Sequence, residues 1–212
     1  MRNEYTPRWH KKSFDGFINR SLPELLAKRL PLMGYQVEST GTYGCRATVT
    51  LASSAGQTSM EYHLPQPDEG GIFKIPERFD HPRVVVPTVS SAALNTAEVK
   101  CVGDHLFDYL QSRLGEAPED LPWDENLIKV WLPLDTWVQD FFATSDLAQP
   151  LEMLNWLSRI EHSRRIRLLE EDLIFHPEQF GRFCPVMMPE GPNMPIIRYI
   201  TIGADIRDGR VV

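Results

Sequence analysis

Four arginines and a histidine stand between positions 159 and 167, and their types point most directly to binding chemistry. Arginine carries a permanent charge and a planar fork of N–H donors that fits phosphate oxygens. Only Glu161 opposes these four charges within the nine residues. The segment suits contact with a phosphate backbone or, alternatively, forms a solvated face balanced by the acids that follow it. The cluster is Arg159, His162, Arg164, Arg165 and Arg167, and the acids are Glu170, Glu171 and Asp172.

A second specialised stretch spans residues 176–193 and reads HPEQFGRFCPVMMPEGPN. Proline fixes φ and removes a backbone donor, whereas glycine admits positive φ, so this mixture specifies one rigid, irregular path. We call residues 189–193, with the sequence PEGPN, the hook. A segment so constrained is typical of a surface that is presented to a partner.

The sequence contains no recognisable catalytic or metal-binding pattern. The six histidines show no ligand spacing, and the three cysteines form no Cys-x-x-Cys pair or disulfide framework. The sequence has no nucleophile elbow, no glycine-rich phosphate loop and no acidic D-F-D-G-D-like run for two-metal chemistry. We therefore predict no catalytic residue and no metal ligand in this chain.

The hook and the residues before it resemble a known family. Residues 181–185 and 189–193 fit the G-R-x-C-P-x-x-x-P-E-G-P-N signature of the β subunit of multisubunit, bacterial-type RNA polymerases. Residues 141–165 are similar, in order, to the family's F-F-x-x-S-x-L-x-Q … N-x-L-S-x-I-x-H-x-R-R segment. The resemblance covers residues 141–194, with thinner matches at 13–17, 69–75 and 83–86.

This resemblance implies a position in the transcription machinery. It implies a DNA-binding protein with a protrusion-like α+β module at residues 1–125 and a fork-like module at 126–212, truncated at its carboxyl end. The fork lines the family's main channel, so the chain would position the template DNA–RNA hybrid. The partners would be DNA, RNA, a β′-type subunit and other polymerase subunits. Mg²⁺ would be held by a partner subunit, and this chain would belong to a nucleotidyltransferase complex without being catalytic alone.

The resemblance also implies which residues contact nucleic acid. With it, we favour phosphate contact or bracing of the hook over a merely solvated face for the arginines. Near phosphate, Glu190 would need Arg182 or Arg165 to offset its charge, so we expect it to hold the hook through a salt bridge; a buried structural ion pair and direct RNA contact stay open as alternatives. Asn193 would donate to a sugar or phosphate oxygen. The predicted nucleic-acid-binding residues are Gln149, His162, Arg164, Arg165, Arg167, Arg182, Pro189, Glu190 and Asn193.

Departures from the family sharpen two expectations. Between Arg165 and His176 the family carries a longer, basic, glycine-rich loop, so the strand-separating fork loop is largely deleted here. Several of the predicted residues fall in the family's rifamycin pocket, where Arg167 replaces a serine. We expect poor rifamycin binding because Arg167 adds bulk and an unpaired charge. A non-catalytic, β-like protein that binds polymerase or a regulator is the alternative function.

Regular elements must position these residues, and their periodicity predicts an α+β fold: a small antiparallel sheet with helices, then a helical and irregular module. We expect the first helix to begin at a Ser21 cap and to end at Pro31. Residues 115–125 are the expected linker, and Asp208-Gly209 is the expected turn of a final hairpin. The other predicted helices are 97–114, 134–142 and 151–169, the last with a break near Asn155. The predicted strands are 43–51, 57–64, 71–75, 83–89 and 196–202.

Composition agrees with a globular protein. The 212 residues are 42% hydrophobic, which suffices for a core. The net charge of −7 disfavours coating of nucleic acid by bulk electrostatics, so any contact must be local. No apolar run is long enough for a transmembrane helix, and the start does not resemble a signal peptide. A cytoplasmic location is therefore expected.

Overall fold

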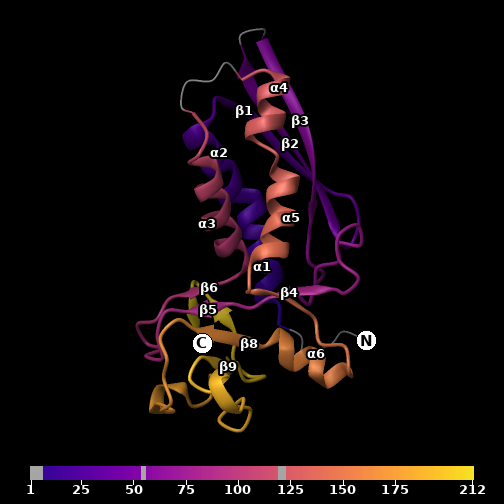
Figure 1. Ribbon diagram of the computed structural model, residues 1–212. Helices are drawn as coiled ribbons and strands as arrows, with labels where there is room; N and C mark the ends of the chain where they lie inside the picture. The colour runs from indigo at the N-terminus through magenta and orange to yellow at the C-terminus, as the bar shows by residue number, and fades with distance from the viewer. Residues whose placement is uncertain (1–6, 54–55, 119–122) are drawn as a thin grey trace.

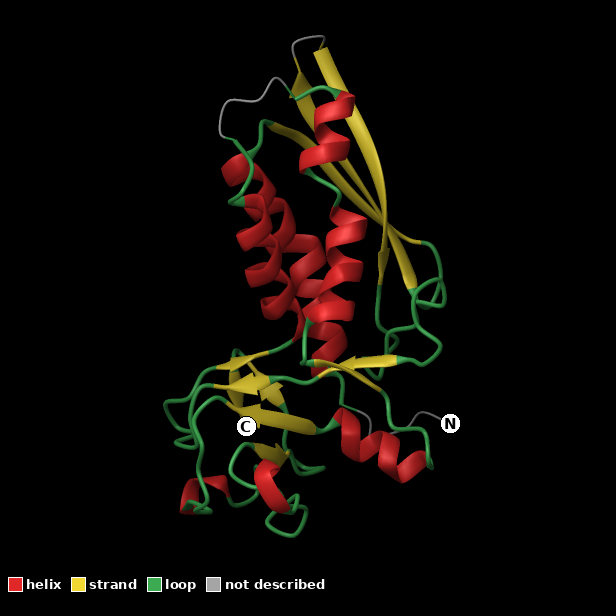
Figure 2. Cartoon of the chain, in the orientation of Figure 1, coloured by secondary structure: helices red, strands yellow, loops and turns green. Residues whose placement is uncertain are grey.

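The computed structural model describes residues 7–53, 56–118 and 123–212. Figure 1 shows an elongated molecule with long helices and strands in its upper part and short strands below. Figure 2 shows that loops make up much of the lower part. None of the described helices is both long and apolar enough to cross a membrane. The predicted α+β fold is confirmed.

The first helical segment starts well before Ser21. Helix α1 (Trp9–Gly16) continues through a π-helical stretch, η1 (Phe17–Ser21), into α2 (Leu22–Arg29). Ser21 has helical backbone angles and makes no capping bond, so the predicted cap was wrong. The capping pattern fails because the preceding turn is already helical and supplies its own carbonyl acceptors. The end was predicted correctly, since Leu30 before Pro31 is extended.

An antiparallel sheet of three strands forms one side of the upper part. The order is β1 (Leu32–Ser39), β2 (Gly44–Ser53) and β3 (Gly56–Pro65), so two predicted strands are confirmed and the first was missed. Alternate residues of β2 are buried, and helices pack against this sheet. The buried face consists of Cys45, Ala47, Val49 and Leu51.

Three further helices complete the upper part. Helix α3 (Val102–Leu114) buries one side chain per turn and packs closely on α1. A Cβ at Gly103 would lie 2.3 Å from the carbonyl oxygen of Ser13, so only glycine fits this helix crossing. Helix α4 (Glu125–Trp131) was missed, whereas α5 (Leu134–Thr144) was predicted and packs on β3. The expected linker, 115–125, lies partly outside the described residues.

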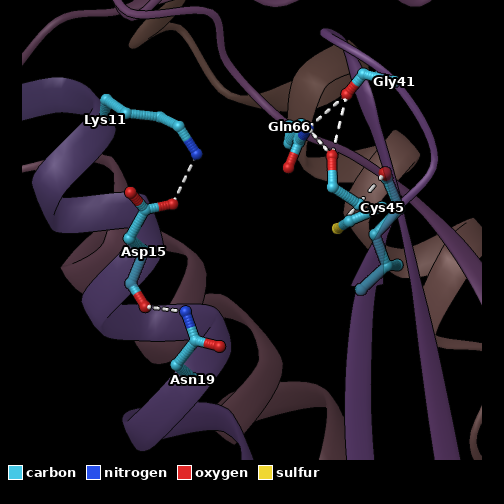
Figure 3. A network of polar contacts seen from close by, with 8 residues as sticks. Lys11, Asp15, Asn19, Gly41, Cys45 and Gln66 are labelled. Carbon is cyan, nitrogen blue, oxygen red and sulfur yellow. Dashed lines mark hydrogen bonds and ion pairs between the residues drawn. The ribbon is translucent and has the colours of Figure 1, made fainter.

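A polar network lies where α1 and η1 face the turn between β1 and β2 (Figure 3). The Lys11 ammonium donates to the Asp15 carboxylate at 2.5 Å, and the Gln66 amide donates to the Ser39 hydroxyl and the Gly41 carbonyl. These groups border a cavity of about 580 Å³. The Lys11–Asp15 pair lies within α1, whereas Gln66, just after β3, is bound to the turn between β1 and β2, so the cavity lies between two separate sets of contacts.

The lower part contains a mixed sheet of short strands. Its order is β6 (Val99–Lys100), β5 (Thr88–Val89), β8 (Arg165–Leu168) and β9 (Ile197–Tyr199), with β5 and β8 parallel. Strands β4 (Arg83–Val85) and β7 (Ala148–Pro150) form a separate pair. The predicted strand at 71–75 was wrong, since only Phe73 makes a bridge there.

The predicted helix over 151–169 was wrong in its bounds, although its expected break near Asn155 is confirmed. Only α6 (Trp156–Ser163) is α-helical, and it begins where the Asn155 side chain accepts from the Ser158 amide at 2.9 Å. The chain then becomes strand β8, because apolar residues alternate with arginines from 165 to 168. Two 3₁₀ turns, η2 (Pro177–Gln179) and η3 (Gly191–Asn193), interrupt the irregular stretch that was predicted.

The predicted hairpin at Asp208-Gly209 is present, but its first strand differs. Strands β10 (Ile206–Arg207) and β11 (Arg210–Val211) pair around these two residues, whose φ values are +48° and +69°. Two positive φ values are typical of the type I′ hairpin turn. The segment predicted as its first strand instead pairs with β8 as β9.

The buried apolar side chains form two clusters. The first cluster lies among α1 to α5 and β1 to β3 and reaches Ala148. The second cluster holds Trp9 and residues of β5, β6, β8 and the hairpin. Helices α4 and α5 belong to the first cluster although they follow residue 125. As a division into modules, the boundary at 125 stays a prediction.

Candidate nucleic-acid interface

Strand β8 places two of the predicted arginines on one face and apolar residues on the other. Ile166 and Leu168 are buried in the second cluster, whereas Arg165 and Arg167 are half-buried on the opposite face. Side chains two apart on a strand share a face, so these guanidinium groups are neighbours. The helix predicted through residue 169 ends at Ser163, so Arg165 and Arg167 lie on a strand instead.

Gln149, His162 and Arg165 form one network although they come from β7, α6 and β8. The Glu152 amide donates to His162 Nδ1 at 3.1 Å, so the proton of the neutral ring is on Nε2. That nitrogen donates to Gln149 Oε1 at 3.1 Å, and Arg165 Nη1 donates to the same oxygen at 3.0 Å. The structure thus brings three predicted residues together.

The neutral state of His162 follows from its surroundings. Burial, followed by the electrostatic effects of Arg165 and His10, lowers the pKa of its imidazole to about 4. His162 is 4% exposed. It therefore orients Gln149 and, through it, Arg165, and its own ring is not presented to a ligand.

Arg165 and Tyr199 form the accessible part of this network. Arg165 Nη2 donates to the Tyr199 hydroxyl at 3.3 Å, and the guanidinium lies 5.7 Å from the centre of the tyrosine ring. Directly opposite residues of paired strands share a face, and these two are partners in the β8–β9 register. A flat aromatic ring beside a fixed guanidinium provides both stacking and phosphate-binding chemistry.

Arg167 makes an exposed ion pair. Its Nη1 lies 2.6 Å from Asp146 Oδ2, and the Asp146 side chain is 75% exposed. The expectation of an unpaired charge at Arg167 was therefore wrong, although the added bulk remains. An exposed ion pair is worth about 0–1 kcal/mol, so a phosphate can compete with the carboxylate.

Arg164 does not face a ligand. It is 6% exposed, and its guanidinium donates to the carbonyls of Ile200, Thr201 and Ala204. It also lies 5.3 Å above the Trp9 ring. The expected phosphate contact from Arg164 is incompatible with this placement, because its donors are committed inside the protein.

The glycine-and-proline stretch is fixed at its base and exposed at its tip. Gly181 and Gly191 have φ values of +78° and +70°, which favour glycine. Phe183 is fully buried, and Arg182 Nη1 donates to Asn95 Oδ1 at 3.0 Å. Arg182 therefore braces the base of the stretch.

The hook itself reaches solvent. Glu190 and Asn193 are exposed and Pro189 is half-buried. Within the described residues Glu190 makes no ion pair, so its expected salt bridge with Arg182 or Arg165 was wrong. The exposed groups of the hook are available to an external partner.

Arg198 is the residue that sequence reasoning missed. It is 0% exposed and donates to the carbonyls of Met194, Ile197 and Asp172 at 2.7, 3.0 and 2.6 Å. It thus ties the residue after the hook to the loop that follows β8. Period-2 alternation could have revealed it, since Arg198 shares a strand face with buried Ile200.

The described residues contain no group of three or more histidine, cysteine, aspartate or glutamate side chains that could hold a metal ion. All three cysteines are free thiols, and Cys45 and Cys101 are buried. Binding through arginine, amide and aromatic groups is the chemistry that this site offers.

Comparison with protein families gives one match over this site. Residues 149–206 match the family model described as RNA polymerase Rpb2, domain 3. The matched segment contains every residue that was predicted to contact nucleic acid, and also Tyr199 and Arg198. It spans β8, the hook and β9, so the family match and the geometric site coincide.

Proposed function

We propose that the chain is part of a bacterial-type β subunit that lines the main channel, because residues 149–206 match the RNA polymerase Rpb2 domain 3 family. A domain of this family implies other RNA polymerase subunits as partners. In this proposal the chain positions the template DNA–RNA hybrid and is not itself catalytic. A β′-type partner holds the Mg²⁺ that nucleotidyl transfer requires.

One observation carries the proposal: Arg165 and Arg167 stand on the accessible face of β8, inside the matched domain. Arg165 is oriented by Gln149 and Tyr199, and Arg167 is held by an exposed carboxylate. Guanidinium groups held in this way bind phosphate with little further loss of side-chain freedom. These groups fix the position of a nucleic-acid backbone without distinguishing its base sequence.

The hook supplies the second contact in this proposal. Asn193 is exposed and carries an amide that donates to sugar or phosphate oxygens. The pyrrolidine of Pro189 offers an apolar surface to a ribose or base. Glu190 is exposed and makes no ion pair among the described residues. Its negative charge therefore repels phosphate and weakens binding at the hook. The predicted contact set becomes Gln149, Arg165, Arg167, Pro189 and Asn193, with His162, Arg164 and Arg182 in supporting positions.

The test uses an assembled polymerase that contains this chain. Arg165→Ala and Arg167→Ala should each shorten the lifetime of the elongation complex. Each should also reduce the slope of log lifetime against log salt by about 0.9 per lost phosphate contact. Arg207→Ala is the matched control, because Arg207 is an exposed arginine of the hairpin that pairs with nearby Asp205. Unchanged slopes in both site variants would refute phosphate contact at β8.

A further inference from the structure

The loop that follows β8 exposes a concentration of large apolar side chains. We call residues 169–180 the outer loop. Leu169, Leu173, Ile174 and Phe180 are 63%, 68%, 67% and 64% exposed, respectively. Single exposed apolar residues are ordinary, but several within twelve positions mark an interaction surface.

The outer loop is held in place by its backbone. The Leu169 amide donates to the Val89 carbonyl at 2.9 Å, and the Asp172 amide donates to Pro195 at 2.8 Å. Buried Arg198 donates to the Asp172 carbonyl. The apolar side chains are therefore presented by an anchored segment, which lowers the entropy cost of binding.

Internal contacts of the outer loop support the same conclusion. The Asp172 carboxylate accepts from the Ile174 amide at 2.7 Å and pairs with His176 at 2.7 Å. Phe175 packs against the second cluster, and the Phe180 ring stacks edge-on against Phe175 with ring centres 5.0 Å apart. The exposed surface thus continues outward from the core.

The charge of the outer loop favours a basic protein partner over a nucleic acid. Its sequence holds four carboxylates and no lysine or arginine. Glu170 and Glu171 are exposed, and neither makes an ion pair within the described residues. A nucleic acid would be repelled here, whereas a partner with lysine or arginine beside apolar side chains would be complementary in both respects.

A second copy of this chain fits the surface less well. Helix α2 carries Lys28 and Arg29, but its leucines are already buried in the first cluster. Helix α6 exposes Trp156 and Leu157, but Arg159 is accompanied by Glu161. The whole chain is also negative, at −7.

We propose that the outer loop docks a basic amphipathic helix of another protein. The apolar face of that helix covers Leu169, Leu173, Ile174 and Phe180, and its cations face Glu170 and Glu171. Amphipathic helices bind apolar surfaces through side chains spaced three or four residues apart. The proposal does not depend on phosphate contact at Arg165 or Arg167.

The test titrates the full chain with a dye-labelled helical peptide built from leucine at helix-face spacing and lysine elsewhere. Two comparison peptides carry glutamate in place of lysine, or the same lysines without a leucine face. Fluorescence anisotropy should show saturable binding of the first peptide and at least about tenfold weaker binding of the others.

Variants locate the binding surface. Leu173→Ser with Ile174→Ser should weaken binding about tenfold or more, and Glu170→Gln with Glu171→Gln should weaken it severalfold and flatten its salt dependence. Leu154→Ser with Leu157→Ser is the matched control and should leave binding unchanged, since these exposed leucines lie near α6. Circular dichroism checks that each variant folds.

Several results would overturn the proposal. They are the absence of saturable binding, equal binding of the glutamate peptide, or equal weakening by the α6 control. Loss of DNA or RNA binding in the Leu173/Ile174 variant would assign the outer loop to nucleic acid. Sedimentation showing self-association that this variant abolishes would assign it to a second copy.

Discussion

The two buried clusters are stabilised in different ways. The first cluster is apolar and lies among long helices and a regular sheet. In the described residues, the buried polar side chains other than His10 all lie in the lower part, and His10 Nε2 donates to the Ser163 carbonyl at 2.8 Å. They are His10, Thr88, His162, Ser163, Arg164, Gln179 and Arg198.

The difference has a backbone cause. Helices and sheets satisfy their own N–H and C=O groups, so their side chains only need to fill space. Irregular loops leave carbonyls without amide partners, and a buried carbonyl without a donor is costly. Arg164 and Arg198 supply several donors from one side chain and thereby allow the loops beside the site to be buried. The lower part therefore has a defined loop geometry, but it tolerates substitution of these buried polar residues poorly.

The largest expected difference between the two clusters is in the free energy of unfolding of Arg198→Met compared with Leu110→Met. Arg198→Met removes the donors to three carbonyls and should lower the free energy of unfolding by roughly 3 kcal/mol or more. Leu110→Met conserves volume in the first cluster and should cost less than about 1.5 kcal/mol. Urea unfolding measures both, with Arg207→Met as the exposed control. Equal costs at positions 110 and 198 would remove the distinction between the clusters.

The second test measures how the stability of the fold depends on pH. Burial lowers the pKa of both His10 and His162 to about 4, from an ordinary 6.5. The unfolded chain binds these protons near pH 6.5 and the folded chain does not, so stability is full above pH 6.5 and falls toward pH 4. The slope is up to about 1.4 kcal/mol per pH unit for each histidine.

Substitution identifies the responsible residue in this pH window. His162→Gln retains an amide donor toward Gln149 and should reduce the slope between pH 6.5 and 4 by up to about 1.4 kcal/mol per unit. Urea midpoints at a series of pH values measure it. A variant that keeps the wild-type slope would show that His162 does not titrate in this manner.

The third test addresses the junction between the clusters. Gly71 has φ of +79°, and an added Cβ would lie 2.3 Å from the His10 Cβ. Gly71→Ala should therefore cost about 1–3 kcal/mol through overpacking and backbone strain. Gly16→Ala is a control without steric conflict, since nothing lies within 4 Å of its added Cβ. Thermal unfolding compares the two, and equal effects would argue against a close contact at His10.

The smallest expected effect concerns the exposed ion pair. Asp146→Asn should change the unfolding free energy by less than about 1 kcal/mol, because the pair with Arg167 is solvated. In the assembled polymerase, it should strengthen nucleic-acid binding by freeing Arg167 for phosphate. Weaker binding in this variant would show that Asp146 holds Arg167 in its productive position.

The sequence by itself determined the elements with strong local signals. Helices α3 and α5 follow from helical spacing, β2 and β3 follow from β-rich runs, and the Asp208-Gly209 turn follows from two residues that tolerate positive φ. The two motifs at 141–165 and 181–193 also indicated a resemblance to the polymerase family, and residues 149–206 match a domain model of that family. Local chemistry sufficed in these cases because each signal acts within a few residues.

Only the tertiary structure decided which of the clustered arginines are accessible. Arg164, Arg165 and Arg167 have the same side chain, and the sequence predicted nucleic-acid contact for all three. The end of α6 and the start of β8 turn Arg164 inward toward distant carbonyls and leave Arg165 and Arg167 on the accessible face. Which carbonyls lack a donor depends on how loops distant in sequence meet, so no short-range pattern records it.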